Sequence, residues 1–192
     1  MDHLLLWDEG LFIGLRAATR SGLGDAFYPW LTDLDNFRIP LLVLWLALVL
    51  FAGRKGRVAA LLLIVVVALT DQVTASILKP WVGRVRPCFA LDGVDLLIPQ
   101  SRSPSFPSSH AANGFGAALF LALRLGRGWW AGLFLAALIS FSRIYVGVHY
   151  PLDALGGACL GAGTALLVHG LFSAQGPARR VQFTRSGADG QL

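Results

Sequence analysis

Charged side chains are scarce in this chain, since Asp, Glu, Lys and Arg together make up only 14% of its 192 residues. Soluble domains carry about 25% charged residues. Hydrophobic residues reach 55% here, and the mean hydropathy is +0.63. This composition excludes an ordinary soluble domain and predicts an all-α, polytopic helix bundle that is integral to a membrane.

Cysteine is also scarce, because only Cys88 and Cys159 occur. Cys159 lies within an apolar run, so a disulfide framework is not expected. The net charge of +5 is not accompanied by a basic face interleaved with aromatic residues, so we expect no nucleic acid partner. The first residues are acidic where a signal peptide would be basic, and we therefore expect no secretory signal.

Five segments approach the roughly 20 apolar residues that a membrane helix needs. We therefore expect five spans, or six if part of the N-terminal segment also crosses the bilayer. The five ranges are 39–53, 58–78, 111–125, 129–148 and 152–174. Together with the N-terminal segment they predict one transmembrane domain over residues 1–175.

The two ends of the chain differ from these spans. In residues 1–37, apolar side chains recur at helical spacing from Leu4 to Leu15, which is typical of a helix lying in the membrane interface. Residues 176–192 are polar and contain three Gly and three Arg residues, with one Pro and one Ser. We predict that this last segment is a disordered cytoplasmic tail.

Basic residues in the short loops predict the orientation, since cytoplasmic loops are enriched in Lys and Arg. With five spans, three basic groups lie on one side, which is then cytoplasmic. They are Arg54, Lys55 and Arg57; Arg124 and Arg127; and Arg179, Arg180 and Arg185. The polar regions 79–110 and 143–153 then lie on the extracytoplasmic side of the cell membrane.

Three polar clusters occupy these two extracytoplasmic regions. The first runs from Lys79 to Arg86 and Pro87, the second covers residues 107–110, and the third contains Arg143, His149 and Asp153. Ionisable groups are not concentrated in this way elsewhere in the sequence. We therefore expect the functional site to be assembled from these three clusters.

The third cluster has the spacing of an activated histidine. Pro151 suits the first turn of a helix, which puts His149 just before the last span and Asp153 within its first turn. A separation of four residues brings the two side chains onto one face. A carboxylate on one imidazole nitrogen fixes the tautomer and leaves the other nitrogen neutral and nucleophilic.

The second cluster has the features of an anion site with a proton donor. His110 and the amides of Ser108 and Ser109 stand at a helix N-terminus, where free N–H groups attract anions. His110 is then placed to protonate a leaving group. A phosphoryl transition state also requires positive charge, which is available from Lys79, Arg86 and Arg143.

At these residues the sequence resembles the type 2 phosphatidic acid phosphatase (PAP2) superfamily, which also includes vanadium haloperoxidases. The family signature is K-x6-RP, then PSGH, then SR-x5-H-x3-D, and its parts appear in order between Lys79 and Asp153. The resemblance implies that His149 forms a phosphohistidine, that Asp153 orients it and that His110 is the general acid. It further implies that no metal ion or other cofactor is needed.

The resemblance also implies a set of phosphate-binding residues, namely Lys79, Arg86, Arg143, Ser108 and Ser109. Ser109 stands where the family usually has glycine. Glycine permits the closest approach of the backbone to phosphate. We expect this substitution to alter the contacts of Ser109 without abolishing function.

The implied activity is removal of phosphate from a lipid phosphate or diphosphate that enters from the bilayer. Undecaprenyl diphosphate is favoured by analogy, with phosphatidylglycerophosphate, phosphatidate and lipid A phosphates as alternatives. A phosphotransferase using the same site and a catalytically silent lipid-binding protein are competing hypotheses. The loop of residues 89–106 is a hypothetical gate for the substrate.

Several residues outside the signature have separate interpretations. Arg84 has no motif position and is interpreted as a snorkelling side chain, whereas Arg102 suits either a loop or a second phosphate. Asp71, within the second span, suits either a functional role or a structural bond to a neighbouring helix. Gly157 and Gly161 form a small-xxx-small pair, which predicts packing inside the bundle.

Overall fold

The computed structural model describes residues 2–173, and every regular element within that range is a helix. The predicted tail at 176–192 lies outside the described residues. The longer helices are α1 (Asp2–Thr19), α2 (Gly22–Thr32), α3 (Arg38–Phe51), α4 (Gly53–Gln72), α7 (Ser109–Leu125), α8 (Ala131–Tyr145) and α9 (Pro151–Ser173). The shorter ones are η1 (Leu34–Phe37), η2 (Val73–Leu78), α5 (Lys79–Val82), α6 (Pro87–Ala90) and η3 (Arg127–Trp129).

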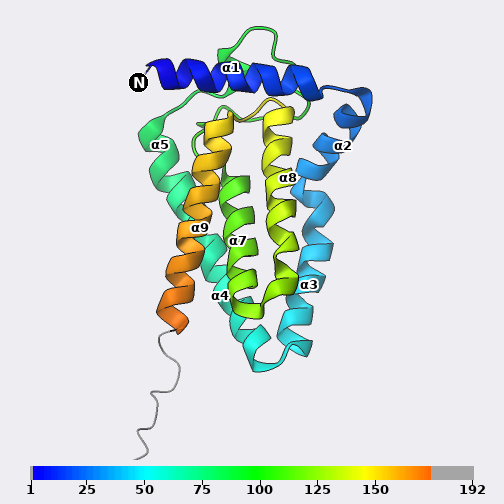
Figure 1. Ribbon diagram of the computed structural model, residues 1–192, viewed down its shortest axis with the longest axis vertical. Helices are drawn as coiled ribbons and strands as arrows, with labels where there is room; N and C mark the ends of the chain where they lie inside the picture. The colour runs from blue at the N-terminus through cyan, green and yellow to red at the C-terminus, as the bar shows by residue number, and fades with distance from the viewer. Residues whose placement is uncertain (1, 174–192) are drawn as a thin grey trace, which may run out of the picture.

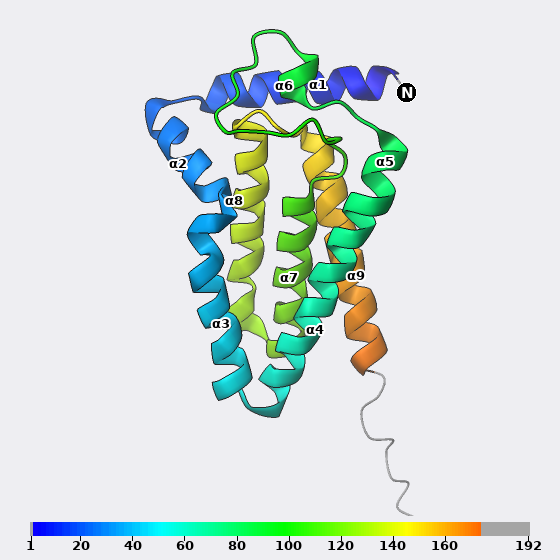
Figure 2. The ribbon, with the colours of Figure 1, turned by 180° about the vertical axis from the view of Figure 1, so that it is seen from behind.

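Helices α3, α4, α7, α8 and α9 run side by side along the long axis of the molecule, and α1 lies across one end of them (Figure 1). Seen from behind, the long connection between α5 and α7 arches over the same end as α1 (Figure 2). Helix α7 is central, since it packs against α4, α8 and α9. The all-helical, membrane-type fold predicted from the sequence is thereby confirmed.

Three helical stretches are long and apolar enough to cross a membrane, namely Leu34–Phe51, Gly53–Ala90 and Pro151–Ser173. Helices α7 and α8 coincide closely with the predicted spans 111–125 and 129–148, but they contain only 17 and 15 residues. Large apolar side chains point outward from the long helices, among them Leu42 and Leu155 at 55% and 59% exposure. Such faces suit contact with lipid.

The two ends of the bundle carry different chemistry. The basic residues at the start of α4 and those between α7 and α8 lie at the end opposite α1 (Figure 1). The two polar connections, from α5 to α7 and from α8 to α9, lie at the α1 end (Figure 2). The expected separation of the basic loops from the candidate site is therefore present in the fold.

Helix α1 is held on the bundle by apolar and polar contacts, among them those of Phe12 and Arg16. The Phe12 side chain is fully buried, and its ring packs edge-on against Tyr150 with the centroids 5.5 Å apart. Arg16 donates from Nε to the carbonyl oxygen of Tyr145 at 3.0 Å. Trp7 of α1 is 79% exposed, and the placement of α1 in the membrane interface stays a prediction.

The glycine pair of α9 packs against α7, as the sequence predicts. A Cβ at Gly161 would overlap the carbonyl oxygen of Ala112, and a Cβ at Gly157 would overlap that of Ser108. Only glycine permits this approach of the two backbones. A polar contact between α4 and α7 is made by Thr70, which donates to the Asn113 side chain of α7.

Asp71 does not make the structural bond to a neighbouring helix that was one of its two interpretations. Its side chain is exposed, and no hydrogen bond or ion pair of Asp71 occurs among residues 2–173. The neighbouring Thr70 faces α7 instead, because adjacent residues of a helix point in different directions.

Candidate functional site

The segment between α8 and α9 positions His149. After α8 ends, the amides of Val148 and His149 both donate to the carbonyl oxygen of Arg143, at 3.1 and 3.3 Å. Gly147 has a φ of +89°, a conformation that residues with a Cβ rarely adopt. This tight reversal places His149 directly in front of α9, where its side chain meets the first turn of that helix.

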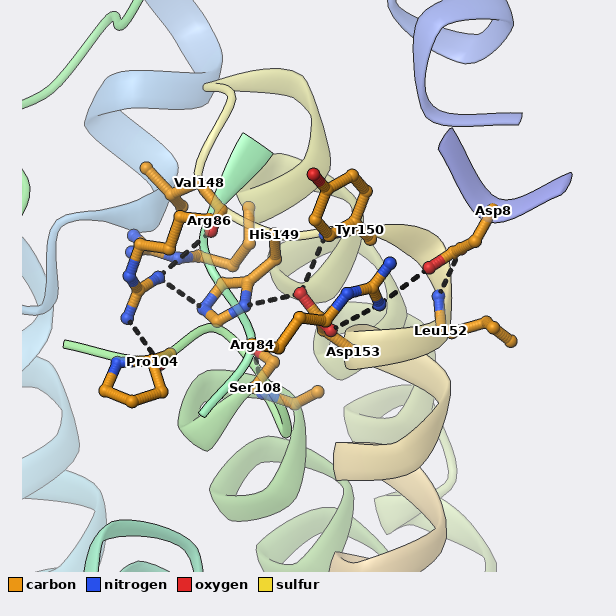
Figure 3. A network of polar contacts seen from close by, with 12 residues as sticks. Asp8, Arg84, Arg86, Pro104, Ser108, Val148, His149, Tyr150, Leu152 and Asp153 are labelled. Carbon is orange, nitrogen blue, oxygen red and sulfur yellow. Dashed lines mark hydrogen bonds and ion pairs between the residues drawn. The ribbon is translucent and has the colours of Figure 1, made fainter. Parts of the chain in front are cut away.

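His149 and Asp153 face each other in the buried centre of the site (Figure 3). The two atoms His149 Nδ1 and Asp153 Oδ2 are 3.4 Å apart. The same Oδ2 accepts a hydrogen bond from the Tyr150 amide at 2.9 Å. The exposed fraction of His149 is 2% and that of Asp153 is zero. The structure therefore brings this predicted pair together.

Arg86 reaches the opposite side of the His149 ring. Its Nη1 lies 3.1 Å from His149 Nε2 and also donates to the carbonyl oxygen of Val148 at 3.0 Å. Its Nε donates to the carbonyl oxygen of Ser103 at 2.8 Å. An arginine can only donate, so Nε2 is the acceptor in this contact, and Nδ1 carries the hydrogen that points at Asp153.

Burial favours the neutral form of His149. Removal from water lowers its pKa from 6.5 to about 4, and the hydrogen bond and charge of Asp153 oppose this shift. The positive charges of Arg86 and Arg143 lower the pKa further. His149 is therefore uncharged near neutral pH, with a lone pair on Nε2.

Arg143 lines a cavity of about 550 Å³ together with His110. Its Nη1 donates to Thr32 Oγ1 at 2.7 Å, and its Nη2 donates to Gln100 Oε1 at 3.2 Å. Its Nε is buried and has no hydrogen-bond partner within residues 2–173. The remaining lining residues are Pro29, Trp30, Asp33, Leu34, Asp35, Ile98 and Pro99. The lining of this cavity thus combines a buried positive charge with apolar side chains and two carboxylates.

The other predicted residues lie at the same end of the bundle. Ser108 is fully buried and caps α7, with its Oγ 3.5 Å from the Ala111 amide. Its own amide donates to the carbonyl oxygen of Asp153 at 3.0 Å, which ties α7 to α9. Ser109 is the first residue of α7. Lys79 is half-buried at the start of α5, and it makes no hydrogen bond or ion pair in the described part of the chain.

The family model described as the PAP2 superfamily matches residues 59–177 of this chain. The chain belongs to the PAP2 superfamily. The matched range contains the three motif clusters, so the resemblance seen in the sequence is confirmed.

Named relatives of this PAP2 chain include enzymes with different lipid substrates. It is 40% identical to a lipid A 4'-phosphatase of Bacteroides thetaiotaomicron over 53% of this chain, and the match spans only half of that protein's length. It is 33% identical to an undecaprenyl-diphosphatase of Sulfolobus acidocaldarius, over 71% of this chain and 65% of the relative.

The fold is also similar to that of a solved PAP2 enzyme, the transmembrane phosphatidylglycerolphosphate phosphatase of Bacillus subtilis. The TM-score is 0.71 and the identity 26%, with 93% of this chain and 90% of that chain covered. The similarity therefore includes the bundle and the end that carries the site.

A contact between Arg84 and Asp153 in this PAP2 site contradicts the interpretation of Arg84 as a snorkelling side chain. Only 12% of that side chain is exposed, and its Nη1 lies 2.9 Å from Asp153 Oδ1. Its other partner is Asp8 of α1, which is distant in the sequence and matches no motif. The sequence carried no signal for this pairing, nor for the contacts of Thr32 and Gln100 with Arg143.

Proposed function

We propose that this protein is a metal-independent lipid phosphate phosphatase in which His149 is the nucleophile. The proposal is carried by one observation, the buried row of Arg86, His149 and Asp153 with contacts of 3.1 and 3.4 Å. The row leaves His149 neutral with Nδ1 directed at a carboxylate, which is the arrangement of an activated imidazole.

In the first chemical step, Nε2 of His149 attacks the phosphorus atom while the bond from phosphorus to the leaving oxygen breaks. Asp153 stabilises the positive charge that develops on the ring. Arg86 exchanges its contact with Nε2 for a phosphate oxygen, since the lone pair must face phosphorus. Arg143 neutralises a second oxygen from the wall of the cavity. His110 donates its proton to the departing oxygen.

In the second step, a water molecule attacks the phosphohistidine. His110, now neutral, takes a proton from this water, and the bond between Nε2 and phosphorus breaks. The products are inorganic phosphate and the original form of His149. Lys79 and the N-terminal amides of α7, at Ser108 and Ser109, provide further positive potential for the transferred group.

The expected test is phosphate release by the purified protein in detergent with EDTA present. Substituting His149→Ala should lower kcat by roughly 10⁴-fold or more, because the nucleophile is removed. His110→Gln should lower it by about 10²–10⁴-fold, as for a lost general acid. The matched control is His3→Ala, at an exposed histidine of α1. Wild-type turnover in His149→Ala would refute this mechanism.

We infer that the bundle crosses the cell membrane five times, through α3, the stretch from α4 to α5, α7, α8 and α9, with the site on the extracytoplasmic side. The basic loops at the opposite end support this orientation. An impermeant thiol reagent tests it, since half-buried Cys88 follows Arg86 closely at the site end. Labelling of Cys88 only in inverted vesicles would reverse the orientation.

Undecaprenyl diphosphate is our favoured substrate, with phosphatidylglycerophosphate, phosphatidate and lipid A phosphates as alternatives. The apolar wall formed by Trp30, Leu34 and Ile98 next to Arg143 supports an amphiphilic substrate that enters from the lipid. A phosphate-release panel over these four classes should give the highest kcat/KM for undecaprenyl diphosphate. A higher value for another class would replace that assignment and leave the lipid phosphatase proposal intact.

We also infer that the loop of residues 89–106 controls entry. Ile98 and Gln100 of this loop line the cavity, and Gln100 contacts Arg143. Exchange of this loop with that of a PAP2 relative should shift the order of substrates in the panel. An unchanged order, in a protein that still releases phosphate, would exclude the gating role.

A further inference from the structure

Arg84 joins two buried carboxylates at the edge of the site. Its Nη1 lies 2.7 Å from Asp8 Oδ2 and 2.9 Å from Asp153 Oδ1, and neither carboxylate side chain is exposed (Figure 3). Its guanidinium carbon also lies 3.8 Å from the ring centroid of Tyr150, within the range of a cation–π contact. Three independent contacts therefore fix the position of this guanidinium.

The two oxygens of Asp153 have different partners. Oδ1 faces Arg84, whereas Oδ2 faces His149 Nδ1 and accepts from the Tyr150 amide. A carboxylate held at both oxygens cannot rotate about its terminal bond without losing a charge-assisted hydrogen bond. Arg84 thus determines which oxygen of Asp153 is directed at the imidazole.

Asp8 completes this arrangement from α1. Its Oδ1 accepts a hydrogen bond from the Leu152 amide at 2.9 Å, at the first turn of α9, while its Oδ2 pairs with Arg84. Without Arg84, Asp8 and Asp153 would be two buried carboxylates with no shared cation between them. Such an uncompensated buried charge is strongly unfavourable.

We infer that Arg84 and Asp8 are positioning residues that hold Asp153 in its working orientation on His149. This inference rests on the proposed phosphohistidine chemistry. Neither residue occupies a position of the PAP2 signature, although Arg84 lies between its Lys79 and Arg86 positions, and the Nη1 of Arg84 already contacts two carboxylates. Its effect on the reaction therefore passes through Asp153, and the docking of α1 becomes a requirement for full turnover.

The first experiment measures kcat and KM for phosphate release in Arg84→Gln, Arg84→Lys and Asp8→Asn. We expect Arg84→Gln to lower kcat by about 10–100-fold, the usual effect of losing a partner of a liganding or reacting group. KM should change by less than about threefold, since substrate contacts are intact. Arg84→Lys should recover part of kcat, because a lysine keeps the charge without the planar fork.

Asp8→Asn tests the same inference if the Arg84→Gln protein does not fold. An asparagine oxygen still accepts from the Leu152 amide, so the cap of α9 is kept. The variant removes only the negative charge that Asp8 places next to Arg84. We expect kcat to fall by about 3–10-fold, with an unchanged melting temperature. The matched controls are Glu9→Gln, at the next position of α1, and Arg127→Gln, at the opposite end of the bundle; both should keep wild-type kcat.

A second experiment separates positioning from a general structural effect. In an Asp153→Asn background, Arg84→Gln should change kcat by less than about threefold, because the residue through which it acts is already neutral. The inference is overturned if the double variant loses kcat by the full product of the losses in Arg84→Gln and Asp153→Asn. It is also overturned if kcat is unchanged in both Arg84→Gln and Asp8→Asn, or if these variants raise KM without lowering kcat. Absence of phosphate release from the wild-type protein would instead overturn the proposed function.

Discussion

Replacing Gly161 by alanine tests the packing on which the site depends. The added Cβ would overlap the carbonyl oxygen of Ala112 and would lie 2.8 Å from the amide nitrogen of Gly116, where ordinary contacts begin at 3.4 Å. Relief of the second contact alone requires a movement of at least about 0.6 Å. Helices α7 and α9 would therefore have to separate along their shared face.

The expected cost follows from this overlap. Overpacking of a tight contact destabilises a protein by about 1–3 kcal/mol, and alanine returns up to about 1 kcal/mol of helix propensity relative to glycine. A net loss of about 1–2 kcal/mol lowers Tm by roughly 2–8 °C in a chain of this size. Activity should fall as well, since α7 carries His110 and α9 carries Asp153.

The assay is thermal unfolding of the purified protein in one detergent, with phosphate release measured on the same samples. Gly163→Ala is the matched control, because it lies in the same helix and a Cβ there has no neighbour within 4 Å. That control should match or slightly exceed the wild-type Tm. If Gly161→Ala unfolds at or above the temperature of Gly163→Ala, the packing argument is wrong.

Three further predictions concern the site itself. Burial keeps the pKa of His149 near 4. As pH is lowered, protonation of His149 should therefore reduce kcat/KM with a midpoint near pH 4. A midpoint near pH 6.5 would contradict the burial of His149. The same lowered pKa makes its contribution to stability complete above pH 6.5 and lost as pH falls toward 4, measurable by thermal unfolding. Thr32→Val should raise KM about tenfold by releasing Arg143. The control Thr164→Val, whose hydroxyl bonds within α9, should keep wild-type KM.

Much of the fold followed from local sequence patterns. The apolar run 58–78 corresponds to α4 and η2, and the run 152–174 corresponds to α9. The regular spacing of His149 and Asp153 around Pro151 also predicted their contact, because a helix start fixes the relative direction of residues four apart. These are features that depend on neighbours in the chain.

Contacts between distant segments could not be predicted in the same way. The sequence predicts a snorkelling side chain at Arg84, whereas the structure makes it a buried partner of Asp153 and Asp8. Thr32 of α2 and Gln100 of the long connection both hold Arg143, and neither has a motif or a periodic position. Each of these pairs joins residues far apart in the sequence, so only packing brings them together.

The sequence by itself determined the membrane class, the helical segments and the set of ionisable groups, because hydrophobic periodicity and motif spacing act over a few residues. The tertiary structure alone decided that Arg86 faces Nε2 of His149 and that Asp8 of α1 is linked through Arg84 to the buried carboxylate of Asp153. These arrangements depend on how helices cross and how closely their backbones approach, and small residues such as Gly161 set that distance.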